Sequence, residues 1–475
     1  MALAAEMPAN VHAEKAQTVT QYGITWTFDK PYEVGKFVNG DWWVAGPAKV
    51  IKVDPAPGAG TEPPGASEVK SRYGAVAMVP DTRMRNGSMV LDKELTASQG
   101  YDSRLKNYNP ALTVAFPLDL EANRSLISTI SNETFPMPCL LTDLMWSSEK
   151  NGSPALRTAA VLTCLSSVPP ADAFRPPYAG TSKPIYELKN LQWKSLPSIE
   201  PAGPVPSFAQ FARYYQRPWL DHTQNWVFQY MGPCENQPNY GREFSRVGSI
   251  TSLMLMLNVP QAEKEKLMIG FIQHGIDLAG LTKAGRVWTA DGGHWNGRKW
   301  PILFAGLMLG DAEMQQLATK GDFSENRQTY YGKGWYGQTV LYQIVLHTSA
   351  QPPYEEKRPE TWDAKQKQQE GYRITISPSW PGTALAVLLM KAKGAWNHDA
   401  FFDYCDRWMR PGSPTMEQRG GVPRNPKEGM AMDPFVDAMW KAYRDKVPAQ
   451  PDGAENLKWT WNADLKSGRY EPNAR

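Results

Sequence analysis

Apolar residues in the first third of the chain fall into short β-branched or aromatic runs. Turn-rich stretches such as Pro55–Gly60 and Arg85–Ser88 separate these runs, and this pattern predicts a series of strands. We expect strands at Ile24–Phe28, Asp41–Val44, Val50–Val53, Ala75–Val79, Leu112–Leu120, Leu126–Ile130 and Ala159–Val168. Several short strands at this spacing are typical of an antiparallel sandwich.

From about Phe208 the apolar residues recur instead with the helical period of about 3.6. One predicted helix face holds Met268, Phe271, Ile272, Ile276 and Ala279, and another holds Phe401, Phe402, Cys405, Trp408 and Met409. Further helices are expected at Phe208–Gln216, Glu243–Leu257, Pro301–Leu309, Thr339–Thr348, Gly382–Lys393 and Pro434–Tyr443. This succession favours an α/α toroid of helical hairpins, with an irregular helical bundle as the alternative, because no short repeat is found.

The predicted fold class is therefore mainly α: an incomplete barrel of helical hairpins, preceded by a β-rich, sandwich-like region. We expect a flexible N-terminus at residues 1–20 and a β-rich domain at 21–170. A Pro-rich linker or arm without helical period follows at 171–207, and the toroid, expected to be the catalytic domain, covers 208–475.

Composition adds one positive indication and excludes several classes of protein. The 18 Trp and 20 Tyr residues offer flat apolar faces that suit stacking on sugar rings, although most such residues serve as core. The formal net charge of +3 in 475 residues gives no strong field for nucleic acid. No run approaches the roughly 20 apolar residues of a membrane-spanning helix.

The first residues of the chain and its cysteines bear on export and on redox state. Met1–Glu6 resembles the small-residue remnant around a signal-cleavage site, so we expect an exported protein, secreted or periplasmic. The four cysteines form no CxxC pair, which argues against zinc-ribbon and thioredoxin chemistry. Cys139 and Cys164 are either bonded or two buried thiols.

The most informative polar stretch is Thr289–Pro301, directly before a strongly apolar helix. It contains Trp295, Asn296, Arg298 and Lys299 beside His294, among three glycines that let a ligand approach the backbone closely. A helix-capping turn whose polar groups only bond their neighbours is the structural alternative.

Two further stretches carry similar chemistry. The segment 322–336 holds an arginine suited to binding a carboxylate, two tyrosines able to transfer protons, and a tryptophan: Arg327, Tyr330, Tyr331 and Trp335. The segment 234–243 holds Glu235, Asn236, Asn239, Tyr240 and Arg242. Loop packing and helix capping are the structural alternatives here. His222 with Asn225, and Tyr372 with Arg373, are weaker candidates of the same type.

This inventory suits β-elimination on a uronic-acid polysaccharide. One group neutralises the C6 carboxylate, a base removes the C5 proton, and an acid protonates the departing O4. The segment Gly292–Gly306, with the glycine pair, His294 and the Arg-Lys pair leading into an apolar helix, resembles the α/α-toroid polysaccharide lyases, especially those acting on glucuronan and alginate.

The resemblance covers about the last 260 residues and implies roles for the candidates. His294 would be the base or a carboxylate partner, Tyr330 or Tyr331 the acid, and Arg327, Arg298 and Asn296 the neutralising and orienting groups. The remaining candidates, expected to bind substrate, are Trp295, Lys299, Glu235, Asn236, Asn239, Tyr240, Arg242 and Trp335. Gly293, not Asn, precedes His294, so Asn236 or Glu235 can instead be the neutraliser.

The predicted substrate is a β-1,4-linked uronate polymer, either glucuronan or mannuronate-rich alginate. The rival predictions are a glycoside hydrolase with two carboxylates among Asp291, Glu235, Asp322 and Glu325, and a non-catalytic glycan-binding protein. No HExxH, GxSxG, GxGxxG or Walker motif occurs, and the six histidines are scattered. We therefore expect no cofactor, no metal site, no nucleic-acid partner and a monomer.

Overall fold

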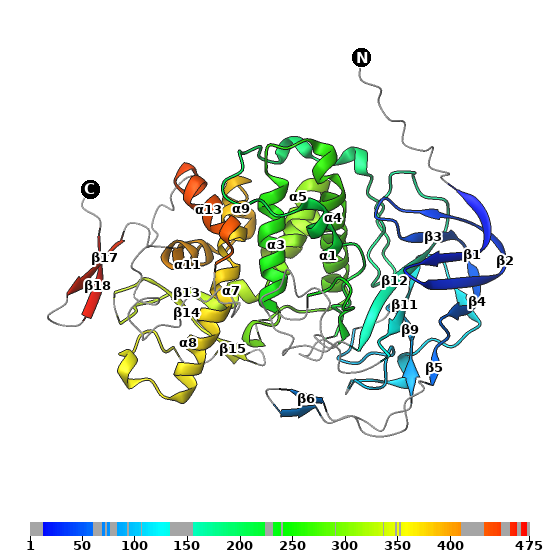
Figure 1. Cartoon of the computed structure of the whole chain (residues 1–475), viewed down its shortest axis with the longest axis horizontal. Helices are drawn as coiled ribbons and strands as arrows, with labels where there is room; N and C mark the ends of the chain where they lie inside the picture. The colour runs from blue at the N-terminus through cyan, green and yellow to red at the C-terminus, as the bar shows by residue number, and fades with distance from the viewer. Residues whose placement is uncertain are drawn as a thin grey trace, which may run out of the picture.

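The computed structural model describes most of the chain. The described residues are 13–59, 69–71, 74–76, 83–92, 95–105, 107–133, 155–223, 231–238, 241–289, 291–335, 337–346, 349–350, 353–409, 432–447, 457–462 and 467–472. In Figure 1 a curled sheet lies at the right and a group of helices occupies the centre and left.

The first part of the chain forms one eight-stranded sheet. Its strands are β1 (Glu14–Gln21), β2 (Ile24–Lys36), β3 (Trp42–Ala45), β4 (Ala48–Asp54), β9 (Ser88–Val90), β10 (Leu118–Leu120), β11 (Arg124–Ser131) and β12 (Leu156–Leu165). The order is β10-β4-β2-β3-β12-β11-β9, with β1 paired to β2. β3 and β12 run parallel and the other neighbours run antiparallel. β1 begins within residues 1–20, where we had expected a flexible terminus.

Short two-stranded pairs lie outside this sheet. They are β5 (Gly58–Ala59) with β8 (Met84–Arg85), β6 (Val69–Ser71) with β7 (Gly74–Val76), β13 (Thr329–Tyr331) with β14 (Val340–Tyr342), β15 (Val345–Leu346) with β16 (Ser349–Ala350), and β17 (Leu457–Asn462) with β18 (Ser467–Pro472). The helix predicted at Thr339–Thr348 is therefore wrong. Its β-branched and aromatic residues pair with β13 instead of forming a helical turn.

Helices follow from Phe208 onward. The α-helices are α1 (Phe208–Tyr214), α3 (Gly241–Leu255), α4 (Gln261–Lys283), α5 (Lys299–Leu309), α6 (Ala312–Lys320), α7 (Ser324–Gln328), α8 (Ala364–Ile376), α9 (Pro381–Leu389), α10 (Lys393–Trp396), α11 (Asp399–Met409) and α13 (Pro434–Tyr443). Short 3₁₀ turns are η1 (Pro110–Leu112), η2 (Leu188–Asn190), η3 (Trp193–Ser195), η4 (Asp291–Gly293), η5 (Pro359–Thr361), η6 (Ser377–Ser379) and η8 (Arg444–Lys446).

The mainly-α toroid with a separate sandwich is therefore wrong. The chain combines 40% helix with 22% strand, and its strands build a curled mixed sheet, not two packed sheets. Among the helices, α3 packs on α9 and α4, and α4 packs on α1 and α5. Apolar periodicity identifies each helix locally but contains no information on whether the helices close into a ring.

The sheet and the helices share a core. On one face of the sheet, Met89, Ile127 and Val161 pack into the cluster that contains the apolar residues of α3, α4, α5 and α9. On the other face Trp26, Val44, Leu162 and their neighbours form a second cluster within the curl. Alternate residues of a strand face opposite sides, so β12 contributes to both clusters.

A buried ion triad joins these layers. Arg175, only 1% exposed, donates from Nε to Asp41 Oδ2 at 2.5 Å, and from Nη1 and Nη2 to the two carboxylate oxygens of Asp277 at 2.9 and 2.5 Å. Asp41 precedes β3 and Asp277 belongs to α4. Gln273 of α4 also pairs with both backbone groups of Arg175. The arginine therefore fixes the segment after β12 to the sheet and to the helices.

We predict that Arg175→Met destabilises the protein by about 3–5 kcal/mol, because two buried carboxylates lose their cation. Urea unfolding followed by circular dichroism measures the change. Lys441→Ala is the control, because Lys441 pairs with Asp437 at the surface and is 72% exposed, where an ion pair contributes at most about 1 kcal/mol. Equal losses in the two variants would contradict the anchoring role.

Candidate functional site

The loop that carries His294 packs directly on the start of α3. Gly297 has a φ of 85°, and a Cβ there would lie 2.5 Å from the backbone nitrogen of Ser245. A Cβ at Gly241, the first residue of α3, would overlap the carbonyl of Gly293. Glycine is thus needed on both sides of the contact, and the loop is part of the protein interior. His294 itself is half-buried.

Two polar residues of this loop, Asn296 and Lys299, have partners within the protein. Asn296 is fully buried, donating to Gln328 Oε1 at 3.1 Å and accepting from Trp380 Nε1 at 3.0 Å. The ammonium of Lys299 bonds Asn326 Oδ1 at 2.7 Å and the carbonyl of Trp396. Burial lowers the pKa of Lys299 to about 7, while nearby Glu325 favours its charged form. The geometry gives Asn296 and Lys299 folding roles and not the expected substrate contacts.

Arg298 is likewise used within the protein. Its guanidinium is fully buried and bonds both carboxylate oxygens of Asp221, at 2.7 and 3.2 Å. It also donates to the carbonyls of His294 and Asn296 at 3.0 and 2.6 Å. A guanidinium held by a buried carboxylate cannot also neutralise a substrate carboxylate, so Arg298 shapes the loop.

The two tyrosines of the second predicted stretch are neighbours in β13. Tyr331 is 53% exposed and donates to Asp403 Oδ2 of α11 at 2.5 Å. The Tyr330 hydroxyl is buried, and burial followed by the charges of Glu355 and Glu356 raises its pKa. Neighbouring residues of a strand point to opposite faces, so the two hydroxyls cannot serve one reacting group. Arg327 pairs with Asp322, and Trp335 is 53% exposed.

The third stretch is only partly described. Glu235 pairs with Arg217 at 3.0 Å and with Arg157 at 3.6 Å. Asn236 is buried and donates to the carbonyls of Tyr214 and Arg217. Arg242 pairs with Glu243 at 2.6 Å inside α3. Asn239 and Tyr240 lie outside the described residues.

A different set of side chains forms the candidate site. Tyr101, His222, Thr223 and Arg286 are each at most 2% exposed. The Tyr101 hydroxyl, both ring nitrogens of His222, the Thr223 hydroxyl and Arg286 Nη2 have no hydrogen-bond partner among the described residues. An unsatisfied buried polar group costs about 1–3 kcal/mol, so several in one place indicate a position where polar ligand atoms bind.

Tyr101 and Arg286 lie close to His222, and Thr223 follows His222 in the chain. The rings of Tyr101 and His222 lie 5.7 Å apart between centroids at an interplanar angle of 73°. Arg286 Nε donates to the carbonyl of Asp221, the residue before His222, at 3.2 Å. The guanidinium lies 4.4 Å from the Trp288 ring and 4.0 Å from the Trp295 ring. Trp295, predicted to bind substrate, therefore holds the arginine that faces this site.

Burial keeps both titratable rings of the cluster neutral. Burial lowers the pKa of His222 to about 3, so its imidazole is neutral and, while enclosed, a weaker base than a free histidine. Burial raises the pKa of Tyr101, so its phenol stays protonated and is a weaker acid than a free tyrosine. Burial also lowers the pKa of Arg286 to about 9, and a bound anion would compensate for this desolvation.

Only a weak signal for this site is present in the sequence. His222 was a minor candidate, and its expected companion Asn225 lies outside the described residues. Tyr101 and Arg286 lie 121 and 64 positions away from His222 in the sequence, and the three residues belong to no common motif. Their proximity depends on the way the sheet loops meet the helices, which no local pattern contains.

Metal and thiol chemistry receive no support within the described part of the chain. Among those residues, no group of three or more His, Cys, Asp or Glu side chains is placed to hold a metal ion. Cys164 and Cys405 are buried free thiols, Cys234 is buried, and Cys139 lies outside the described residues. No described helix is both long and apolar enough to cross a membrane.

We predict that His222 makes the protein sensitive to acid. The unfolded chain takes up a proton at His222 near pH 6.5 and the folded protein only near pH 3, so stability present above about pH 6.5 is lost as the pH falls. Protonation of His222 in the unfolded chain should lower the free energy of unfolding by about 2 kcal/mol between about pH 7 and about pH 5. Urea unfolding at the two pH values should show a smaller loss for His222→Gln, and Thr223→Val should keep the parent's loss. An unchanged loss in His222→Gln would refute the assignment.

Searches against protein-family models, curated proteins and solved structures find no match for this chain. Family membership therefore contributes nothing to the functional argument, which depends on the site itself. The site combines a neutral imidazole, a neutral phenol and a desolvated guanidinium whose Nη2 meets no acceptor in the described ranges.

Proposed function

We propose that the protein is a lyase that cleaves a uronate polysaccharide by β-elimination, and that Arg286, His222 and Tyr101 carry the reaction. The observation that supports this proposal is the cluster of buried imidazole, phenol and guanidinium atoms without a hydrogen-bond partner among the described residues. β-Elimination needs a base, an acid and a carboxylate-binding group, and these residue types match the three roles.

The proposed reaction begins with binding of the substrate carboxylate. Arg286 Nη2 binds the C6 carboxylate, which makes the C5 proton more acidic by stabilising the charge that develops on the carboxylate. A neutral ring nitrogen of His222 removes the C5 proton. The C4–C5 double bond forms as the C4–O4 bond breaks, and the Tyr101 hydroxyl gives its proton to O4. The imidazolium then returns a proton to the phenolate, which restores both groups.

The described carboxylates argue against the hydrolase alternative. A glycoside hydrolase needs two available carboxyl groups roughly 5–10 Å apart. Near the cluster, Asp221 is bonded to Arg298. Glu235 and Asp322 are held by arginines. Glu325 accepts at Oε1 from the backbone of Gly297 at 2.8 Å, while its Oε2 has no partner among the described residues. The side chain of Asp291 lies outside the described part of the structure.

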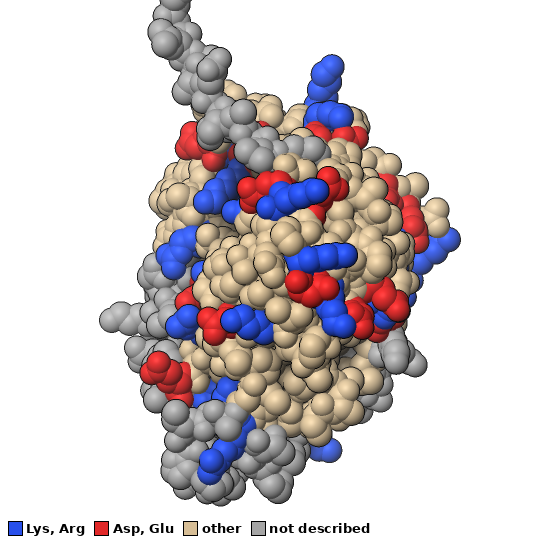
Figure 2. Space-filling model, turned by 90° about the vertical axis from the view of Figure 1, so that its right-hand side faces the viewer, with Lys and Arg blue, Asp and Glu red and all other residues tan. Residues whose placement is uncertain are grey.

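Substrate recognition is assigned to specific groups and not to a general positive field. Figure 2 shows Lys and Arg side by side with Asp and Glu on the face of the sheet, and the net charge is only +3. Glucuronan and poly-mannuronate share the configuration at C4 and C5, so both fit one arrangement of base and acid. A secreted or periplasmic location, where such polymers occur, is part of the proposal.

His294 remains a second imidazole near this site. Its carbonyl bonds Arg298, which in turn bonds Asp221 beside His222. Tyr101, His222 and Arg286 are enclosed in this structure, so the proposed reaction requires a conformation in which the polymer reaches them. His294 is the more exposed of the two histidines, and mutation of each one separates their roles.

We predict that the protein releases products absorbing near 230 nm, the signature of the C4–C5 double bond, from glucuronan or poly-mannuronate. His222→Gln, Tyr101→Phe and Arg286→Lys should each lower kcat by about 10²–10⁴-fold, the usual contribution of a positioned acid or base. Tyr443→Phe is the matched control, because the Tyr443 hydroxyl bonds the carbonyl of Glu200 at an exposed position. Circular dichroism checks that each variant is folded.

The outcomes of this assay separate the alternatives. New reducing ends without ultraviolet absorbance would refute the lyase proposal in favour of hydrolysis. Retention on a polysaccharide gel without cleavage would refute it in favour of glycan binding. Loss of activity in His294→Gln with full activity in His222→Gln would move the proton transfer to His294 and overturn the role of His222.

A further inference from the structure

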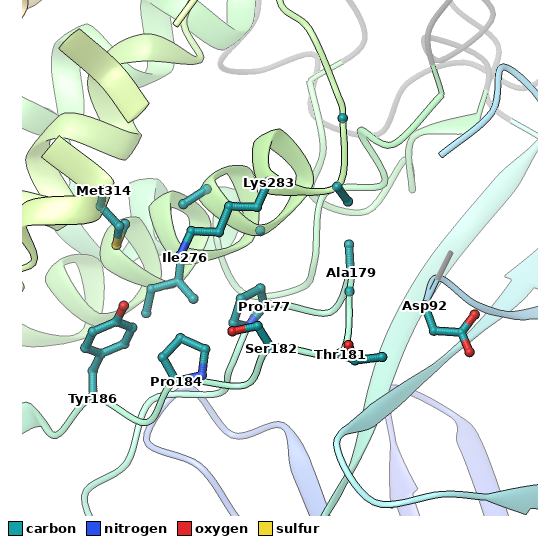
Figure 3. A pocket seen from close by; sticks show the side chains of 15 residues that line it. Asp92, Pro177, Ala179, Thr181, Ser182, Pro184, Tyr186, Ile276, Lys283 and Met314 are labelled. Atoms are coloured by element: carbon teal, nitrogen blue, oxygen red, sulfur yellow. The ribbon is translucent and has the colours of Figure 1, made fainter. Parts of the chain in front are cut away.

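The segment 171–207, which follows β12 and leads to α1, is called the connector below. A cavity of about 520 Å³ lies between the connector and α4. Figure 3 shows Ile276 and Lys283 of α4 on one wall and Pro177, Ser182 and Pro184 of the connector on the other. In the same view Met314 of α6 and Asp92 lie on opposite sides of the cavity (Figure 3). Its volume is in the range of about 300–1,000 Å³ that is usual for sites that bind small molecules.

The wall made by the connector is fixed in place. Arg175 anchors its start between Asp41 and Asp277. The Lys183 ammonium bonds the carbonyl of Pro177 at 2.5 Å, and Gly180 N bonds the carbonyl of Leu91 at 2.6 Å. Because this wall is already ordered, a ligand that binds in the cavity loses little binding free energy to ordering of the protein.

Contact with α4 fixes the same wall from the opposite side. A Cβ at Gly280 would overlap the Pro177 ring, so glycine at this position lets the connector touch the helix. Added Cβ atoms at Gly180 and Gly285, which also line the cavity, would meet no atom within 4 Å. The cavity therefore has closely packed walls and open space between them.

The lining combines three kinds of contact. The rings of Pro177, Pro184 and Tyr186 offer flat apolar surfaces, and Thr181 and Ser182 offer hydroxyl groups. This mixture of ring faces and hydrogen-bonding groups suits a sugar, whose own surface alternates in the same way. The Tyr186 hydroxyl donates to Asp311 Oδ2 at 2.5 Å, which holds its ring in position.

Lys283 adds a cation to the lining. Its ammonium lies 2.7 Å from Glu313, whose side chain is 67% exposed. Such a surface pair contributes at most about 1 kcal/mol, so a ligand carboxylate can replace Glu313 at small expense. The other charged residue of the lining, Asp92, is paired with Arg124.

We propose that this cavity is a second, non-catalytic carbohydrate site that holds a uronate unit of an acidic oligosaccharide, with its carboxylate on Lys283 and its ring against Tyr186. The choice of a uronate rests on the proposed function. The cavity shares none of the four residues of the His222 cluster. The connector separates the two, because Pro177 and Ala179 line the cavity while the Tyr178 hydroxyl bonds the carbonyl of Trp219, close to Asp221.

Calorimetric titration with tetra-glucuronate and tetra-mannuronate tests the proposal. The His222→Gln protein is used as the parent so that the oligosaccharide is not cleaved. Adding Lys283→Ala should weaken one binding event by about tenfold, the effect of losing about 1.4 kcal/mol. Adding Thr181→Trp, which places a large ring at the exposed rim, should abolish that event. Lys441→Ala, an exposed ion-paired lysine elsewhere, should leave it unchanged.

The results distinguish this inference from the proposed function. Binding that both Lys283→Ala and Thr181→Trp weaken supports the cavity site even if the protein shows no lyase activity. Unchanged affinity in both variants would overturn the cavity site even if lyase activity is found. Equal affinity for a carboxyl-reduced tetrasaccharide would overturn the role of Lys283.

Discussion

The buried contact of Arg175 with Asp41 and Asp277 is the constraint on which the rest of the arrangement depends. It brings the sheet, the connector and α4 together at one point, using a guanidinium that is 1% exposed. Buried charges are favourable only when their partners are placed accurately, so this triad permits little sliding between the layers. Tyr178 follows three residues later, its backbone bonded to Asp277 and its hydroxyl directed toward the chain before His222. One anchored segment thereby forms a wall of the cavity and supports the cluster.

A second buried pair, Arg298 with Asp221, does the same for the candidate site. It ties the glycine-rich loop before α5 to the residue before His222, over 77 positions of sequence. The loop in turn supplies Trp295, which covers the guanidinium of Arg286. Most polar residues of this loop are thus occupied in holding a neighbouring cluster, whose hydrogen-bonding groups have no partner within the described part of the chain. Such unmet groups are unfavourable to folding and are expected where a protein has a function to perform.

The sequence predicted elements better than their assembly. The helix at Pro434–Tyr443 has the expected bounds, and strands are found within Ile24–Lys36 and Arg124–Ser131 as the β-branched runs indicated. The failure at Thr339–Thr348 has a tertiary cause, because pairing with β13 decides between strand and helix there. The toroid was wrong because helical period carries no information on how helices close around one another. For the site, the sequence directed attention to a loop that supports the cluster through Trp295, and not to the cluster itself, of which only His222 was a weak candidate. Arg298 and Lys299 resemble ligand-binding residues until their partners, Asp221 and Asn326, are seen.

The central claim is that Arg286, His222 and Tyr101 together receive a uronate unit. A crystal structure of the His222→Gln protein with tetra-glucuronate or tetra-mannuronate tests it most directly. The account predicts a C6 carboxylate oxygen about 3 Å from Arg286 Nη2, with C5 facing residue 222 and O4 facing the Tyr101 hydroxyl. An oligosaccharide whose carboxylate binds elsewhere, with Arg286 still covered by protein, would contradict the claim.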